Sequence, residues 1–266
     1  MIERKRNVAA ILIAVIVALM YVTGIPGALF VDIDVGDVDP VSITLFINIL
    51  IAMAVGLALV RILIPTFEVG FTSRNFVSGL RAFGISCVIA FLVPFVAVII
   101  GLYPFDHSPT IWKVLFEGVI YFIGVGIIEE FFCRGLLQNG IAGLLDTRKN
   151  SQLVAILITA TVFGLGHIVA VIGEPGWLAF SRISWAIGLG VYFGAIYALT
   201  RNLWLVAMFH FVVNLSGLPF NLSTQDSYPA ISTIIVLATY LGLAMYGIYV
   251  LRQRDEAPAN LKWSDV

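Results

Sequence analysis

Long apolar blocks recur along the whole chain, and they are the feature that most limits how it can fold. Each block is about 20 residues long, the length that a helix rising about 1.5 Å per residue needs to cross roughly 30 Å of hydrocarbon. Of the 266 residues, 60% are hydrophobic and only 12% are charged, whereas soluble domains are typically about 25% charged. The sequence therefore argues against a soluble fold and predicts an integral membrane protein.

We predict an all-α, polytopic bundle of about eight transmembrane helices that forms one domain over residues 1–266. No internal repeat or long hydrophilic insertion divides the chain, and only the tail at 252–266 is expected to be a soluble extension. Glycines at 124 and 126 and at 188, 190 and 194 predict close approach between helix backbones. The predicted helices span 7–30, 41–64, 79–103, 111–143, 152–172, 177–200, 203–218 and 230–251.

Basic residues gather in every second loop, and this pattern predicts how the helices are oriented. Cytoplasmic loops of membrane proteins hold an excess of Lys and Arg. The 4–6, 61–81, 148–149 and 252–262 segments carry such residues, whereas the loop at 32–39 carries four aspartates. Both termini are therefore expected to be cytoplasmic, and the protein is expected to be a multi-pass protein of the prokaryotic cell membrane. The lipid bilayer is its first expected partner.

Three predicted helices carry strongly polar residues in their interiors. An ionisable group in hydrocarbon costs several kcal/mol unless it is paired or faces a wet cavity, so each of these residues needs an explanation. Helix rise, counted from the predicted cytoplasmic ends, brings them towards one layer near the middle of the membrane. The residues are Glu129, Glu130 and Arg134 in the fourth helix, His167 in the fifth, and His210 and Asn214 in the seventh.

Spacing within the fourth helix separates the two adjacent glutamates. Residues four apart share a helix face, so Glu130 and Arg134 are expected to form an ion pair. Glu129 lies on a different face and is left free to face a cavity, where we expect it to have a chemical role. Two further pairs share a face by the same spacing, Phe163 with His167 and His210 with Asn214.

Structural explanations compete with chemical ones for several of these residues. The Glu130–Arg134 pair would fix helix register, and His167 alone would be a hydrogen-bonded packing residue. Glu117 is expected to form a structural pair with Arg182 near the outward end of the bundle. Cys133 has only a neighbouring arginine to suggest a reactive thiol, so a nucleophilic role is disfavoured.

Together, the three spacings resemble the motifs of the CPBP family of intramembrane proteases, which includes CAAX proteases and bacteriocin-processing enzymes. The Glu-Glu-x-x-x-Arg motif corresponds to residues 129–134, Phe-x-x-x-His to 163–167, and His-x-x-x-Asn to 210–214. The resemblance covers about residues 115–220. The predicted eight-helix bundle with cytoplasmic termini is also similar to the type II CAAX prenyl protease fold.

The resemblance implies an intramembrane endopeptidase that cleaves a hydrophobic or lipidated peptide or protein substrate, in CAAX-type or bacteriocin/leader-type processing. It implies that Glu129 acts as general base on a water molecule, assisted by His167. It further implies that His210 and Asn214 stabilise the oxyanion. Glu130, Arg134 and Phe163 would support this set.

The sequence leaves the cofactor and the functional class open. The family has also been described as metalloproteases, and Glu129, His167 and His210 could bind zinc as a His₂Glu set. The His-Glu-x-x-His pattern is absent, so a metal-free glutamate mechanism is favoured. The main rival is a non-catalytic membrane immunity or scaffold protein with the same fold. A net charge of −1 gives no indication of a nucleic-acid partner.

Overall fold

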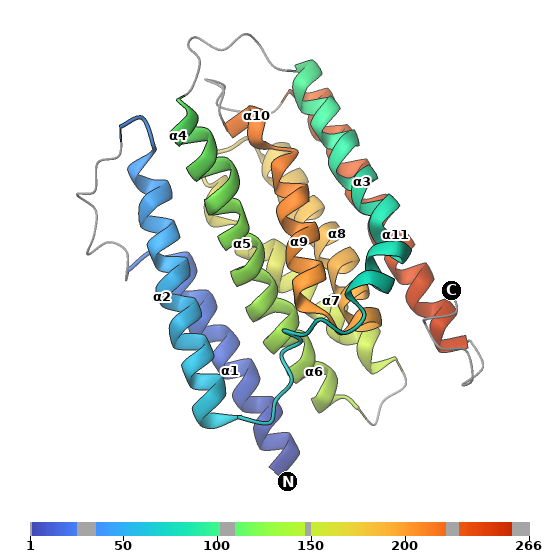
Figure 1. Cartoon of the computed structure of the whole chain (residues 1–266). Helices are drawn as coiled ribbons and strands as arrows, with labels where there is room; N and C mark the ends of the chain where they lie inside the picture. Colours follow the sequence, from blue (N-terminus) through green and yellow to red (C-terminus); the bar gives the residue numbers. More distant parts are fainter. Residues whose placement is uncertain (1, 26–35, 102–109, 147–149, 222–228, 257–266) are drawn as a thin grey trace.

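The computed structural model describes residues 2–25, 36–101, 110–146, 150–221 and 229–256, and its helices run roughly alongside one another (Figure 1). No strand occurs among these described residues, as the all-α prediction requires. Within these described ranges, six helical spans are long and apolar enough to cross a membrane. Five are single helices: α1 (Ile2–Thr23), α2 (Pro40–Leu63), α3 (Phe76–Gly101), α8 (Gly176–Thr200) and α11 (Ala230–Glu256).

The sixth span, Ile111–Leu144, carries both glutamates and contains two π-helical segments. In π-helical segments the backbone bonds reach one residue further than in an α-helix, and such segments are frequent at functional sites. The second π segment follows Glu130 directly. In chain order the span consists of α4 (Ile111–Lys113), η2 (Val114–Ile120), α5 (Tyr121–Glu130), η3 (Phe131–Gln138) and α6 (Asn139–Leu144).

Two helices are shorter than predicted. α7 (Ser151–Gly166) was expected to reach residue 172, and α9 (Leu203–Leu215) to reach 218. Each is followed by a short helical turn, η4 (Val169–Val171) and α10 (Leu218–Asn221). The expected count of eight transmembrane helices is therefore not confirmed, because six of the described spans meet the length needed and two apolar helices do not.

Helix boundaries also differ at the chain ends. α1 begins at Ile2 and ends at Thr23, whereas helix was expected over 7–30, of which 26–30 lies outside the described residues. α11 continues to Glu256, past the predicted end at 251, and so takes up the first part of the expected soluble tail. The rest of that tail, 257–266, also lies outside the described residues.

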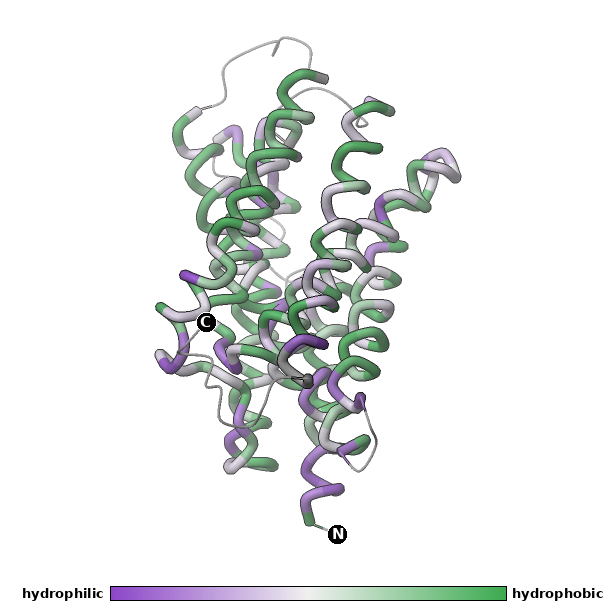
Figure 2. Tube along the Cα trace, turned by 90° about the vertical axis from the view of Figure 1, so that its right-hand side faces the viewer, coloured by the Kyte–Doolittle hydropathy of each residue, from purple (hydrophilic) through white to green (hydrophobic). Residues whose placement is uncertain are grey.

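The surface of the bundle is apolar along its length, as lipid contact requires. Figure 2 shows hydrophobic residues along the helices, with hydrophilic residues at the end that holds the N-terminus. Large apolar side chains such as Leu19, Ile85, Ile100 and Met245 are exposed. A monomeric soluble protein rarely exposes so much contiguous apolar surface. The chain is an integral, multi-pass membrane protein.

α8 forms the centre of the bundle and packs closely on both α7 and α11. Its second half, including Tyr192, Phe193 and Tyr197, is almost completely buried. A Cβ at Gly190 would lie 2.9 Å from Ala160 of α7, and one at Gly188 would lie 2.9 Å from the carbonyl oxygen of Tyr240 of α11. The predicted close approach of helix backbones at these glycines is confirmed.

Gly126 brings α5 and α9 together in the same way, and this contact decides where the polar residues of the two helices meet. A Cβ at Gly126 would lie 2.8 Å from the backbone oxygen of Ala207 and 3.2 Å from the backbone nitrogen of Phe211. Neither backbone atom can move without shifting the helix. Because His210 lies between these two residues, the contact sets its distance from the end of α5.

We expect Gly126→Ala to lower the free energy of unfolding by about 1–3 kcal/mol, because the added methyl group overpacks the α5–α9 contact. Gly242→Ala in α11 is the matched control, since a Cβ there meets nothing within 4 Å. The measurement is unfolding of the purified protein in mixed detergent and SDS micelles. Equal stability of the two variants would contradict this account of the α5–α9 packing.

A polar network ties the segment before α2 to the start of α4. The side chain of Asp37 accepts hydrogen bonds from the hydroxyl and, at 3.0 Å, from the backbone N–H of Thr110. Lys113 donates to the Asp37 carbonyl at 3.2 Å and pairs with Glu117 at 3.1 Å. The expected Glu117–Arg182 pair is wrong, because the nearer Lys113, four residues before Glu117, takes that carboxylate. Arg182 instead pairs with Glu174 at 3.6 Å.

Hydrogen bonds from Thr110 hold the pKa of Asp37 below its ordinary value of 3.8. The bond from the Thr110 hydroxyl has the larger effect, and the bond from its backbone N–H adds to it. A lowered folded-state pKa means that the stabilisation is fully present above pH 3.8 and is lost as the pH falls through the folded-state pKa. We therefore expect Asp37→Asn to lower the melting temperature slightly at pH 7. The difference from wild type should shrink below pH 3.8 in thermal scans; a difference that is constant with pH would contradict the assignment.

Candidate active site

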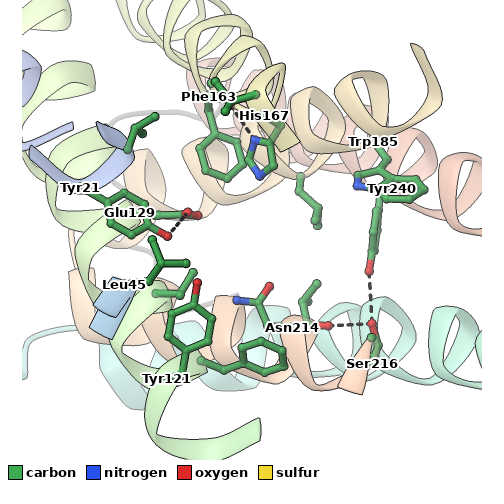
Figure 3. A pocket seen from close by; sticks show the side chains of 18 of the residues that line it. Tyr21, Leu45, Tyr121, Glu129, Phe163, His167, Trp185, Asn214, Ser216 and Tyr240 are labelled. Carbon is green, nitrogen blue, oxygen red and sulfur yellow. Dashed lines mark hydrogen bonds between the residues drawn. The ribbon is translucent and has the colours of Figure 1, made fainter. Parts of the chain in front are cut away.

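A cavity of about 720 Å³ lies among the helices and is walled mainly by apolar side chains. Its lining comes from α1, α2, α3, α5, α7, α8, α9 and α11, so most of the fold contributes to it. Figure 3 shows polar side chains at opposite sides of this space. They are Tyr21, Tyr121 and Glu129 on one side, Trp185, Ser216 and Tyr240 on the other, with His167 and Asn214 between.

Glu129, near the C-terminal end of α5, presents its carboxylate to this cavity, as predicted. The residue is 8% exposed. The Tyr21 hydroxyl donates to its Oε1 atom at 3.1 Å. Its Oε2 atom lies 3.5 Å from Nε2 of His210. One carboxylate oxygen therefore has a hydrogen-bond donor, while the other faces an imidazole at a distance too long for a good hydrogen bond.

Glu130 and Arg134 form the predicted ion pair at 3.1 Å, and both side chains are fully buried. The guanidinium also donates to the backbone oxygen of Gly190 at 3.1 Å and lies 4.9 Å from the centre of the Phe163 ring. A buried charge is tolerated only when its partners replace water. Arg134 thus links η3 to α7 and α8 while it neutralises Glu130.

His210 adds a contact that helix spacing did not predict. Its Nδ1 atom lies 2.7 Å from Oε1 of Glu130. Because Glu130 is paired with Arg134, its carboxylate only accepts, so the proton of this bond lies on Nδ1. The imidazole stacks on Phe193 at 5.1 Å and meets the edge of Phe163 at 6.1 Å. The Glu130 carboxylate therefore accepts hydrogen bonds from Arg134 of its own span and from His210 of α9.

His167 follows the last residue of α7 and lines the cavity beside Phe163. Its Nδ1 atom lies 2.9 Å from the backbone oxygen of Phe163, and the two rings meet edge to face at 4.9 Å. A carbonyl oxygen only accepts, so Nδ1 carries the proton and Nε2 of the neutral ring has a free lone pair. The histidine is thus oriented as a hydrogen-bond acceptor or base at the cavity wall.

The structure brings most, but not all, of the predicted set into one space. Glu129, Phe163, His167 and Asn214 line the cavity, and Figure 3 shows the Asn214 side chain projecting into it from α9. His210 lies one turn before Asn214 but is 4% exposed and does not line the cavity. It contacts both glutamates from behind. Cys133 is completely buried and also does not line it.

Comparison with known families agrees with this arrangement. Residues 111–216 match the family model described as type II CAAX prenyl endopeptidase, Rce1-like. The chain carries a domain of the CAAX protease (CPBP) family. The matched segment holds all three motifs and ends just after Asn214, and membership supports CAAX-type intramembrane endopeptidase activity in general. No curated protein and no solved structure matches the chain.

The part of the CAAX protease domain that the structure describes was compared with the ligand geometry of zinc. Catalytic zinc is held by three protein ligands around one point. Among the residues that the structure describes, no group of three or more His, Cys, Asp and Glu side chains could hold a metal ion. Glu129 approaches His210, but His167 does not join them. The set of Glu129, His167 and His210 considered from the sequence therefore does not fit the metal here.

Two parts of the site lie beyond what motif spacing predicts. The Glu130–His210 bond joins two motifs, and only the packing of α5 on α9 reveals it. Tyr21 and Tyr121 carry hydroxyl groups in apolar helices, and neither belongs to a motif. A tyrosine inside a transmembrane segment is itself a weak signal, because a buried hydroxyl usually finds a partner.

We expect Arg134→Met to lower the free energy of unfolding by about 3–5 kcal/mol, because it leaves the Glu130 charge buried without its main partner. The double variant Glu130→Gln with Arg134→Met should regain part of this loss, since no charge remains to be compensated. SDS-driven unfolding of Arg134→Met, Glu130→Gln and the double variant in detergent is the measurement. A double variant as unstable as the sum of the two single ones would show that the pair is not coupled.

Proposed function

We propose that the protein is an intramembrane endopeptidase in which Glu129 activates a water molecule to hydrolyse a peptide bond. One observation carries the proposal. The Glu129 carboxylate and a histidine with a free Nε2 lone pair face the same largely apolar cavity inside a membrane protein. An acceptor pair of this kind can orient a water and take its proton.

In the proposed reaction, the water oxygen attacks the substrate carbonyl carbon while its proton passes to Glu129. His167 accepts the second hydrogen bond of that water and so fixes its position. The carbonyl oxygen becomes an oxyanion, to which the side-chain N–H of Asn214 donates. When the C–N bond breaks, Glu129 returns the proton to the departing amine, and the carboxylate is restored.

The part that His210 plays in this scheme depends on whether its Nε2 atom carries a proton. With Nδ1 donating to Glu130, its Nε2 atom can stabilise an oxyanion only if it also carries a proton. Its position behind the cavity wall favours a second task, to hold Glu129 from the side of Oε2.

The proposed substrate is a hydrophobic or lipidated peptide segment, in CAAX-type or leader-type processing. The cavity supports this class because its wall is made mainly of apolar side chains. A peptide carrying an apolar chain loses little free energy by leaving the bilayer for such a space. The positive residues at the N-terminal end of the bundle support a cytoplasmic location for both termini.

Two alternatives make different predictions. A non-catalytic immunity or scaffold protein would use the same cavity to hold a peptide without cutting it. A zinc enzyme would need movement that brings His167 to Glu129 and His210. Both are decided by the same cleavage experiment.

Wild type in nanodiscs, tested on a quenched library of prenylated and unprenylated peptides, is expected to cleave a subset of them. Glu129→Gln should lower kcat at least about 100-fold, as expected for loss of a general base. Glu174→Gln is the matched control, because that carboxylate pairs with Arg182 near the start of α8. His167→Ala and Asn214→Ala should each reduce kcat more than they raise KM.

Treatment with a chelator distinguishes the metal-free mechanism from a zinc-dependent one. Activity kept in chelator agrees with the metal-free mechanism, whereas loss that zinc restores would replace it with a metal-dependent one. No turnover of any peptide by folded wild type, together with peptide binding that survives Glu129→Gln, would sink the protease proposal in favour of a binding protein.

A further inference from the structure

The helix α1 contributes to the site although it lies far outside the segment that matches the CAAX protease domain, residues 111–216. Three of its residues, Ala18, Tyr21 and Val22, line the cavity. Tyr21 is the member with a polar group there, and its hydroxyl donates to Oε1 of Glu129 at 3.1 Å (Figure 3). A residue 108 positions away in sequence thus touches the proposed general base.

α1 is held firmly against the domain, so this contact is not an accident of a loose helix. A Cβ at Gly140 would lie 2.8 Å from the backbone oxygen of Asn7, and one at Gly143 would overlap the Asn7 side chain. Near the other end of the helix, the Tyr21 ring lies 6.3 Å from that of Phe132. Close backbone approach at one end and ring packing at the other fix the hydroxyl relative to α5.

The two oxygens of Glu129 are therefore treated differently. Oε1 accepts from Tyr21, while Oε2 is the oxygen nearer His210, with no hydrogen bond of ordinary length. A carboxylate can turn about its last side-chain bond, since that rotation is soft. A fixed donor on one oxygen stops this rotation and keeps the second oxygen available to bind water.

We infer that Tyr21 is a positioning residue whose hydroxyl holds the Glu129 carboxylate in the orientation that the reaction requires. The inference rests on the proposed function, because it assigns a task within the same site. It means that the catalytic apparatus extends beyond the three motifs to the first helix. Removal of the hydroxyl should slow the chemical step and leave substrate binding in the apolar cavity largely unchanged.

The test compares Tyr21→Phe with wild type in the full-length protein. Phenylalanine keeps the ring beside Phe132 and removes only the donor. We expect kcat to fall about 10- to 100-fold, the factor that corresponds to one hydrogen bond to a charged group, with KM within about twofold. Tyr246→Phe, on the exposed side of α11, is the matched control and should change neither constant. An unchanged kcat, or a change confined to KM, would overturn the inference.

A second measurement does not depend on turnover. Dicyclohexylcarbodiimide is an apolar reagent that modifies carboxyl groups within membranes, and mass spectrometry of peptides can locate its adduct on Glu129. Without the Tyr21 hydroxyl, Oε1 is free to react, so labelling of Glu129 should be several-fold faster in Tyr21→Phe than in wild type or Tyr246→Phe. Equal labelling would overturn the inference even if no substrate is cleaved, whereas faster labelling without any cleavage would retain the contact and reject the protease proposal.

Discussion

Two adjacent carboxylates in the middle of a membrane-embedded span are the constraint on which the rest of this structure depends. Hydrocarbon offers neither of them water, so the fold must supply partners. Glu130 receives Arg134 from its own span and His210 from α9, in a fully buried cluster. Glu129 instead borders a cavity and receives a single hydroxyl from α1. Of these two neighbouring residues, Glu130 is therefore fully engaged by its partners, whereas Glu129 stays available for chemistry.

Backbone geometry provides the close approach that these partners need. α9 can place His210 against both glutamates because Gly126 lets the backbone of Ala207 come within contact distance of α5. The π-helical winding of η3 begins directly after Glu130 and carries Arg134 towards Gly190 of α8. α8 in turn approaches α7 closely at Gly190. The polar cluster and the glycine contacts thus form one connected set, in which a shift of any helix disturbs the charges.

Much of the site was predictable from sequence because its strongest contacts are local. The Glu130–Arg134 pair and the Phe163–His167 contact both join residues four apart, and helix periodicity alone gives such pairs. The Glu130–His210 and Tyr21–Glu129 contacts were not predictable, since they depend on which helices become neighbours. The error for Glu117 has another cause, because its partner Lys113 lies four residues before it, a spacing that helix periodicity does give. Hydropathy predicted apolar segments correctly but not where α7 and α9 end, because apolar residues continue past both helix ends.

The early end of α7 has a consequence for His167. In a helix that continued, the carbonyl of Phe163 would accept the backbone N–H of His167, four residues later. Here that N–H turns to the carbonyl of Gly164, at 3.1 Å, and the Phe163 oxygen is left for the imidazole. Because α7 ends here, the Phe163 carbonyl can accept from the His167 imidazole, and this bond selects the tautomer with the proton on Nδ1. If α7 were long enough to span the bilayer by itself, the Phe163 carbonyl would accept the backbone N–H of His167 instead. The imidazole would then lose this hydrogen bond and be free to rotate.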